Sequence, residues 1–209
     1  MKRDHRLRLN QKAFTIVELL IATAILSTIL VMVTTMMVSI GNLYYKGVNQ
    51  ARVQDDVRNI TDEVAQHLQL SDAAPLPPAV SPNGKIKAYC IGATRYTFTL
   101  NTQIGNLAAQ SPHVLWRDNN PTPDSCATTN TFLTNPPPAT NGTELIVPNS
   151  SLTFFSISNT SPYTVSVGVA FGDLTLLNLN GLNTTCKGNL GDQFCATSTL
   201  TTTVAQRIN

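Results

Sequence analysis

The chain has 209 residues, of which only 12% are charged, and this length suits one long helix and one modest domain. Its formal net charge of +2 is unevenly spread along the chain. Residues 1–12 hold five basic residues and one acidic residue, whereas the rest of the chain holds nine basic and eleven acidic residues. No basic patch for nucleic acid is evident in this composition, so we expect no nucleic-acid partner.

The first element is an apolar run from Lys12 to Ile40 with one charged residue inside it, Glu18. A helix of ~20 residues crosses the ~30 Å hydrocarbon core of a bilayer, so this run predicts a membrane-spanning helix. The positive-inside rule then keeps the short N-terminus in the cytoplasm and the rest of the chain outside. The basic residues that set this orientation are Lys2, Arg3, Arg6, Arg8 and Lys12.

Three interpretations of this run compete: a cleaved secretory signal, an uncleaved signal anchor, and a leader that is cut at the near edge of the apolar segment. A secretory signal has an apolar core of ~7–15 residues followed by a small-residue cleavage site. Ser39 and Gly41 could form such a site, but the core is about twice too long for this class and it contains Glu18. Both features count against a secretory signal without removing it, and the other two interpretations stay open beside it.

The start of the chain resembles the N-terminal signature of type IV prepilins and type II secretion pseudopilins. The resemblance is carried by a short basic leader followed by Ala13, Phe14, Thr15, Glu18, Leu19 and Leu20. In that family a membrane aspartic peptidase cuts on the cytoplasmic side of the helix and N-methylates the new amino terminus. The resemblance implies cleavage between Ala13 and Phe14 and N-methylation of Phe14. Ala13 stands where the family usually has glycine.

The same resemblance gives Glu18 a role in assembly. Cleavage after Ala13 would leave a free α-amino group on Phe14 at the edge of the membrane, where the carboxylate of a neighbouring subunit can pair with it. Such a pair is stronger in hydrocarbon than in water, because the attraction scales inversely with the effective dielectric constant. We therefore expect Phe14, Thr15 and Glu18 to form an assembly site. The alternative is that Glu18 reaches the membrane interface by itself.

The pattern becomes amphipathic beyond Ile40. One apolar stripe at helical spacing consists of Val53, Val57, Ile60, Val64 and Leu68. This predicts a helix from about Phe14 to about Leu70, which the prolines at 75, 77 and 78 end. We divide the chain into a leader (1–13), a transmembrane and polymerisation helix (14–41), an amphipathic continuation (42–74) and a β-rich head (75–209).

The head is predicted to consist of short strands separated by turn-rich loops. Tyr96, Phe98 and Leu100 alternate with polar residues, as in a half-buried strand with Arg95 on the exposed face. Further strands are predicted at 114–116, 144–147, 152–157, 163–171 and 199–204. An amphipathic helix packed on an antiparallel sheet buries both apolar faces, which gives an α+β, pilin-like fold.

All four cysteines follow the membrane segment, on the side that the topology makes oxidising: Cys90, Cys126, Cys186 and Cys195. Their even number favours two disulfides, for which three connectivities are possible. Proximity in the sequence favours Cys186 with Cys195 and Cys90 with Cys126.

Little in the sequence indicates catalysis. His5 falls in the leader, His67 reads as a packing or surface residue of the helix, and His113 has no acid or nucleophile at motif spacing. Asp173 and Asp192 lie in glycine-containing loops without the EF-hand spacing. Trp116, the only tryptophan, is expected to be partly buried between sheet and helix. We expect no enzyme, no metal and no cofactor.

The sequence therefore predicts a subunit of a type IV pilus or pseudopilus, and a minor subunit in particular. The resemblance implies as partners a prepilin peptidase and methyltransferase, other pilin subunits, an inner-membrane assembly platform and membrane lipid. Before assembly the chain would be a single-pass membrane protein with its C-terminal domain outside the cytoplasm, and afterwards part of a cell-surface filament. Two alternatives stay open: a signal-anchored binding module that never polymerises, and a secreted enzyme or binder cut near Gly41.

Overall fold

The computed structural model describes residues 14–72, 74–81, 84, 86–103, 113–119, 142–188 and 191–207. The chain divides into two compact units, Met1–Leu43 and Tyr44–Asn209, which we call the N-terminal unit and the second unit. One helix, α1 (Ile16–Leu70), contributes to both.

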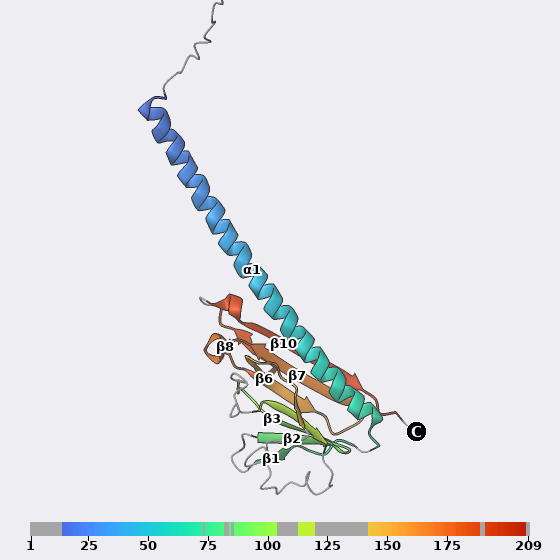
Figure 1. Ribbon diagram of the computed structural model, residues 1–209. Coiled ribbons are helices and arrows are strands. Elements are labelled where there is room, and N and C mark those ends of the chain that lie inside the picture. Colours follow the sequence, from blue (N-terminus) through green and yellow to red (C-terminus); the bar gives the residue numbers. More distant parts are fainter. Residues whose placement is uncertain are drawn as a thin grey trace, which may run out of the picture. The chain divides into compact units, whose positions relative to one another are not determined.

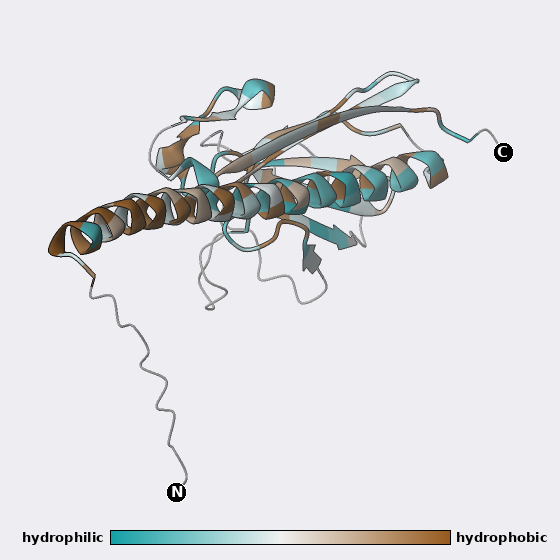
Figure 2. Ribbon diagram, turned by 90° about the horizontal axis from the view of Figure 1, so that it is seen from above, coloured by the Kyte–Doolittle hydropathy of each residue, from teal (hydrophilic) through white to brown (hydrophobic). Residues whose placement is uncertain are grey.

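The helix has the length that the sequence predicts, and it begins two residues later than expected. Figure 2 shows the ribbon of α1 brown in its apolar first part and increasingly teal after it. The helix ends where the Ser71 amide donates to the His67 carbonyl at 3.0 Å. The prolines at 75, 77 and 78 follow, and proline cannot continue a helix.

Among the described residues of the second unit, the strands are all antiparallel and form three sheets (Figure 1). The five-stranded sheet has the order β1 (Ala79–Val80), β2 (Ile86–Ile91), β3 (Thr94–Thr99), β4 (Leu115–Asn119), β5 (Gly142–Glu144). The three-stranded sheet has the order β10 (Ala196–Val204), β7 (Tyr163–Phe171), β6 (Ser150–Ile157). A hairpin joins β8 (Leu177–Asn178) to β9 (Thr185–Cys186). The α+β class is confirmed, with three sheets in place of the single sheet expected.

Most of the predicted strands are present. The predicted strand 163–171 coincides with β7, while 152–157 and 199–204 lie within β6 and β10. The prediction at 144–147 was wrong beyond Glu144, because β5 ends there, although the Leu145 amide still donates to the Leu115 carbonyl of β4 at 2.9 Å. Strands β1, β2, β8 and β9 were not predicted.

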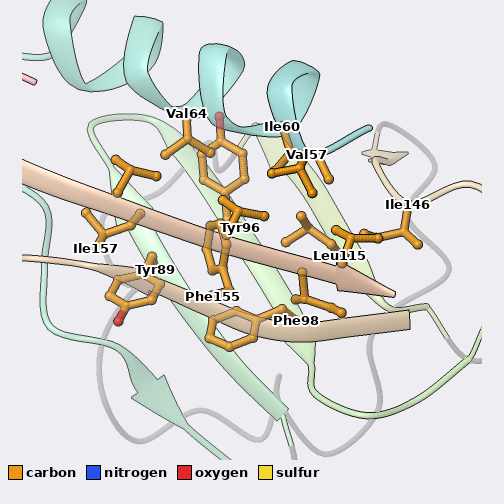
Figure 3. Close-up of a cluster of buried hydrophobic side chains, with 14 of the residues drawn as sticks. Val57, Ile60, Val64, Tyr89, Tyr96, Phe98, Leu115, Ile146, Phe155 and Ile157 are labelled. Atoms are coloured by element: carbon orange, nitrogen blue, oxygen red, sulfur yellow. The ribbon is translucent and has the colours of Figure 1, made fainter. Parts of the chain in front are cut away.

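The apolar stripe of α1 builds the main core, and each of its five predicted members is at most 2% exposed. Figure 3 shows Val57, Ile60 and Val64 pointing from the helix toward the aromatic side chains of the strands. Phe155 on β6 of the three-stranded sheet packs against aromatic rings of the five-stranded sheet. Its ring centroid lies 5.0 Å from that of Phe98 on β3 and 5.8 Å from that of Tyr89 on β2. Such aromatic pairs stabilise a core beyond the area they bury.

Arg95 corrects the simple alternation expected for β3. The residue was expected on the exposed face, yet it is only 3% exposed. Asp118 lies directly opposite it on β4, and Nε of Arg95 donates to Oδ1 of Asp118 at 3.0 Å while a second guanidinium nitrogen donates to Oδ2. A buried arginine is tolerated here because the paired carboxylate opposes its charge in a two-pronged geometry.

Candidate functional site

The first part of α1 is an apolar surface that the rest of the described chain does not cover. Every residue from Phe14 to Leu43 is exposed except Gly41, which is half-buried. Large apolar side chains such as Ile16 (79% exposed) and Met32 (70%) are among them. By length and composition α1 is able to cross a membrane. A continuous apolar surface of this size indicates contact with lipid or with other protein chains.

The polar groups within this segment are satisfied inside the helix. Each hydroxyl between residues 23 and 39 donates to a backbone carbonyl three or four positions earlier; the donors are Thr23, Ser27, Thr28, Thr34, Thr35 and Ser39. The Ser27 hydroxyl, for example, lies 2.8 Å from the Ala24 carbonyl oxygen. Unpaired polar groups are costly in hydrocarbon, so this arrangement suits a helix that lies in a bilayer.

Thr15 and Glu18 form a capping box at the start of α1. The Thr15 amide and the Thr15 hydroxyl both donate to Oε2 of Glu18 at 3.1 Å, and the Glu18 amide donates to the Thr15 hydroxyl oxygen at 3.2 Å. This reciprocal arrangement satisfies amides that have no partner in the first helical turn. The Thr-x-x-Glu spacing was readable from the sequence, but the sequence analysis considered only an intermolecular partner for Glu18.

The predicted cleavage site is only partly described. Phe14 precedes the helix and is 83% exposed, so nothing in the described chain covers it. Ala13 lies outside the described residues, and the cut between the two residues stays a prediction.

The second unit holds the Cys186–Cys195 disulfide that proximity in the sequence favours. Cys90 is also disulfide-bonded. Cys126 lies outside the described residues, so the Cys90–Cys126 pairing stays a prediction.

The disulfide loop is attached to α1. Lys46 forms an ion pair with Asp192, the amide side chain of Asn49 donates to the Gln193 carbonyl at 3.1 Å, and that of Gln50 donates to the Thr197 carbonyl at 2.9 Å. Three polar side chains of one helical stretch thus fix the loop and the start of β10. The Asp192 carboxylate, which the sequence places in a glycine-containing loop, is thus paired with the Lys46 ammonium.

His67 and Tyr96 form a polar contact between helix and sheet. Nδ1 of His67 lies 2.5 Å from the Tyr96 hydroxyl, and the Arg117–Glu63 ion pair at 3.0 Å lies beside them. Burial lowers the pKa of His67; the Glu63 carboxylate opposes this shift and the Arg117 guanidinium reinforces it. The same burial raises the pKa of Tyr96 above its usual range. The contact is structural, as expected for a packing residue.

His113 has an acidic neighbour that the sequence did not reveal. Its Nδ1 lies 3.3 Å from Oε2 of Glu144, and its ring centroid lies 4.2 Å from that of Trp116. The Glu144 carboxylate also accepts the amides of Val114 and Leu115, at 3.2 and 2.8 Å. Burial raises the pKa of Glu144, while these amides lower it. The carboxylate therefore holds β5 against β4, which is a structural role.

Trp116 lies against Gly142 of β5, not between sheet and helix as expected. A Cβ atom at Gly142 would come within 2.1 Å of Nε1 of Trp116, so glycine alone fits against the ring.

Asp173 caps the short helical turn that follows it, since its Oδ1 accepts a hydrogen bond from the Thr175 amide at 2.8 Å, and this bond lowers the pKa of Asp173. Within the described ranges, no three His, Cys, Asp or Glu residues are grouped so that they could hold a metal ion.

Comparison with known proteins identifies one similarity, at the N-terminus. Residues 8–34 match the family model of the prokaryotic N-terminal methylation motif. No curated protein and no solved structure matches the chain. The motif together with the long N-terminal apolar helix fits a type IV pilin-like protein. It points to a structural subunit rather than an enzyme, and it implies a prepilin peptidase and other pilins as partners.

Proposed function

We propose that this chain is a minor subunit of a type IV pilus or a related pseudopilus. In this proposal it is made as a prepilin, cleaved after Ala13, N-methylated on Phe14, and polymerised through α1. The observation that carries the proposal is the methylation motif at residues 8–34, which extends into the apolar first part of α1, and the rest of the described chain does not cover this part.

Processing would convert the start of the chain into an assembly site. Hydrolysis of the Ala13–Phe14 peptide bond releases residues 1–13 with a new carboxylate on Ala13 and leaves a free α-amine on Phe14. In its neutral form this amine takes a methyl group from the methyl donor of the methyltransferase, which departs without the methyl group, and the nitrogen loses one proton. The resulting secondary amine is protonated at neutral pH. The basic leader is lost in the cleavage step. The mature chain then begins with a cation, and Glu18 provides an anion one helical turn further on.

Assembly then places the Glu18 carboxylate of one subunit against the Phe14 amine of another. Within the described part of the single chain, the hydrogen bonds to the Glu18 carboxylate come from Thr15, through neutral donors. A hydrogen bond that involves two ionised groups is roughly twice as strong as one between neutral groups, so a neighbouring amine competes well for this carboxylate. The pair would fix the axial position at which each subunit joins.

Before assembly the same helix stores the subunit in the inner membrane. Residues 14–41 span the bilayer, and the chain from residue 42 onward, with the β-rich head, lies outside the cytoplasm. The head begins at about residue 75 and faces outward in the filament. The assembly platform would extract the helix from lipid into the filament core.

The absence of proline from the apolar run and the polar character of residues 48–68 support a minor subunit rather than the major one. This assignment follows from resemblance to the minor pilin and minor pseudopilin branch.

A signal-anchored binding module is the second candidate. The observation that favours it is the capping box, because Thr15 satisfies part of the hydrogen-bonding capacity of Glu18 without a neighbouring subunit. In that case the leader stays attached and the chain remains in the membrane.

The test compares filaments sheared from cells with the membrane fraction of the same cells. We expect the chain in both fractions of normal cells and in the membrane fraction only when the prepilin peptidase is inactivated. Presence in the membrane fraction alone, with an active peptidase and with filaments that other subunits form, would contradict polymerisation and favour the anchored module.

A further inference from the structure

We propose that the exposed edge of β10 pairs with an extended, uncharged strand of a neighbouring subunit in the filament. This inference rests on the proposed function, which supplies the neighbouring subunits, and it identifies a surface of the second unit that takes part in assembly. The contact would be made by backbone hydrogen bonds, as when a strand is added to the edge of an existing sheet.

Strand β10 has a neighbouring strand on one side only. The three-stranded sheet has the order β10, β7, β6, so β10 forms one edge of this sheet within the described part of the chain (Figure 1). All nine residues of β10 pair with β7 without a shift in register, from Ala196 opposite Phe171 to Val204 opposite Tyr163. The edge is therefore long and uninterrupted.

A hydrogen bond at the far side of β7 shows which backbone groups of β10 face outward. The Ser158 amide donates to the Thr164 carbonyl at 2.9 Å, so the backbone groups of Thr164 point toward the β6 side and away from β10. Thr203 lies opposite Thr164. In an antiparallel pair, two opposite residues either exchange hydrogen bonds or both point their backbone groups away from each other. The amide and carbonyl of Thr203 therefore point away from β7.

The same alternation identifies the outward groups along the whole strand. Successive residues point their backbone groups to opposite sides, so Thr199 and Thr201 share the direction of Thr203. Thr197 shares it too, and its carbonyl accepts a hydrogen bond from the Gln50 side chain at 2.9 Å. Thr199, Thr201 and Thr203 are exposed, and no described residue bonds to their amides or carbonyls. They form a row of open donors and acceptors.

The edge of β10 lacks the features that usually protect an open edge. Such edges pair readily with other chains, and natural sheets prevent this with short strands, bulges, prolines or charged side chains. The nine residues of β10 include no proline and no charged residue, and no bulge interrupts their pairing with β7.

The other sheet edges in the described ranges are protected. β1 and β5, at the two edges of the five-stranded sheet, have two and three residues, and β8 and β9 have two each. β6 has a bulge between Leu152 and Phe154, and Gln103 bridges to Ser151 beside it. The open edge of β10 is thus a particular feature of this strand.

The chemistry of the edge selects an extended polypeptide as its partner. Open amides and carbonyls recur at every second residue of β10, and another extended chain offers matching groups at the same rise of ~3.4 Å per residue. Ala196 and Val204 belong to the core, so the threonines between them that point their backbone groups outward have their side chains on the opposite face. Pairs of threonines across neighbouring strands stabilise a sheet, which suits a partner strand with small, uncharged side chains.

Amide hydrogen exchange resolved to single residues tests the pairing on the full processed chain, once in detergent and once in sheared filaments. In detergent the amides of Thr199, Thr201 and Thr203 should exchange fast, whereas those of Leu200 and Thr202, which face β7, should exchange slowly. In filaments the three threonine amides should exchange at least ~10-fold more slowly, because each gains a hydrogen bond. Unchanged fast exchange of these three amides in filaments would overturn the pairing.

A proline at the centre of the edge tests the same contact by incorporation. Thr201→Pro removes an amide that points away from β7, and proline is tolerated at such edge positions. The lost donor and the added ring should reduce incorporation into filaments by at least ~10-fold. Ala205→Pro is the matched control, because Ala205 is exposed and immediately follows β10, and it should be incorporated like the unmodified chain.

Slow exchange of the Leu200 and Thr202 amides in detergent verifies that each variant is folded. Equal incorporation of folded Thr201→Pro and Ala205→Pro would overturn the pairing at this edge. Absence of the unmodified chain from filaments would overturn the proposed function and this pairing together, whereas its presence there with fast exchange at the three threonines would overturn the pairing alone.

Discussion

Replacing Glu18 by glutamine separates the two roles that its carboxylate can have. Glutamine at the third position of a helix still completes a capping box, because its side-chain oxygen accepts the same hydrogen bonds. The bonds from the Thr15 amide and hydroxyl to Oε2 therefore keep a partner in the variant. Only the negative charge is lost, so the start of α1 is preserved while the proposed pair with a neighbouring amine is removed.

The two contributions differ in size. An ion pair at 4 Å is worth ~4 kcal/mol at an effective dielectric constant of ~20, which corresponds to a factor of ~10³ in the equilibrium for incorporation. Loss of a capping side chain costs only ~1 kcal/mol. We therefore expect Glu18→Gln to reduce incorporation into filaments by up to ~10³-fold, while Thr15→Ala, which removes the box and keeps the charge, reduces it by less than ~10-fold.

The assay quantifies the chain by mass spectrometry in sheared filaments and in the membrane fraction of the same cells. The amount of each variant in the membrane and the removal of its leader should be unaffected. Glu18→Gln replaces a carboxylate by an uncharged residue, which enters lipid more easily, and Thr15→Ala changes no charge. Glu18→Ala, which lacks both the charge and the cap, should be as defective as Glu18→Gln. Normal incorporation of Glu18→Gln together with a defect in Thr15→Ala would refute the ion-pair argument and assign Glu18 to capping alone.

Three further predictions concern the fragment 44–209, which is the second unit. Leu68→Ala should lower the free energy of unfolding of this fragment in urea by about 2–5 kcal/mol, because Leu68 is 1% exposed. The control Leu70→Ala, at a position that is 65% exposed, should change it by at most ~0.5 kcal/mol. Similar losses of stability in the two variants would contradict the assigned helix face. Replacing Cys186 and Cys195 together by serine should lower the free energy of unfolding by about 2–3 kcal/mol, because the closure entropy of a short loop is lost. Thiol titration of the unreduced, unmodified fragment should find no free thiol, and four reactive thiols would contradict the oxidised head. Because burial lowers the pKa of His67, the histidine of the unfolded chain binds a proton more readily than that of the folded chain as the pH falls. The neutral, buried His67 therefore contributes to stability in full above the unfolded pKa of ~6.5, and this contribution is lost as the pH falls from there toward the lowered folded pKa. The free energy of unfolding of His67→Gln should lose this part of its pH dependence, and an unchanged pH profile would contradict the buried position of His67.

The helix could be predicted almost completely from the sequence because its signals are local. The apolar run and the stripe of Val53, Val57 and Leu68 are repeats along one element, and no knowledge of other segments is needed to recognise them. Strand β7 was predicted for the same reason. Strand β2 was missed because its last four residues are all buried, so it lacks the alternation of a half-exposed strand.

The polar contacts of the head could not be predicted in this way. Arg95 and Asp118 are 23 residues apart, and His113 and Glu144 are 31 apart. They meet only through the pairing of β3, β4 and β5, and strand register is not encoded in local spacing. The capping box is a different case, because its spacing is local and the sequence contains it in full.

Mass spectrometry of the N-terminus of the protein isolated from native membranes or filaments tests the central claim most directly. Our account predicts that the chain begins at Phe14 and that its α-amino group carries one methyl group. A mature chain that still begins at Met1, or that starts beyond Ser39, would contradict it.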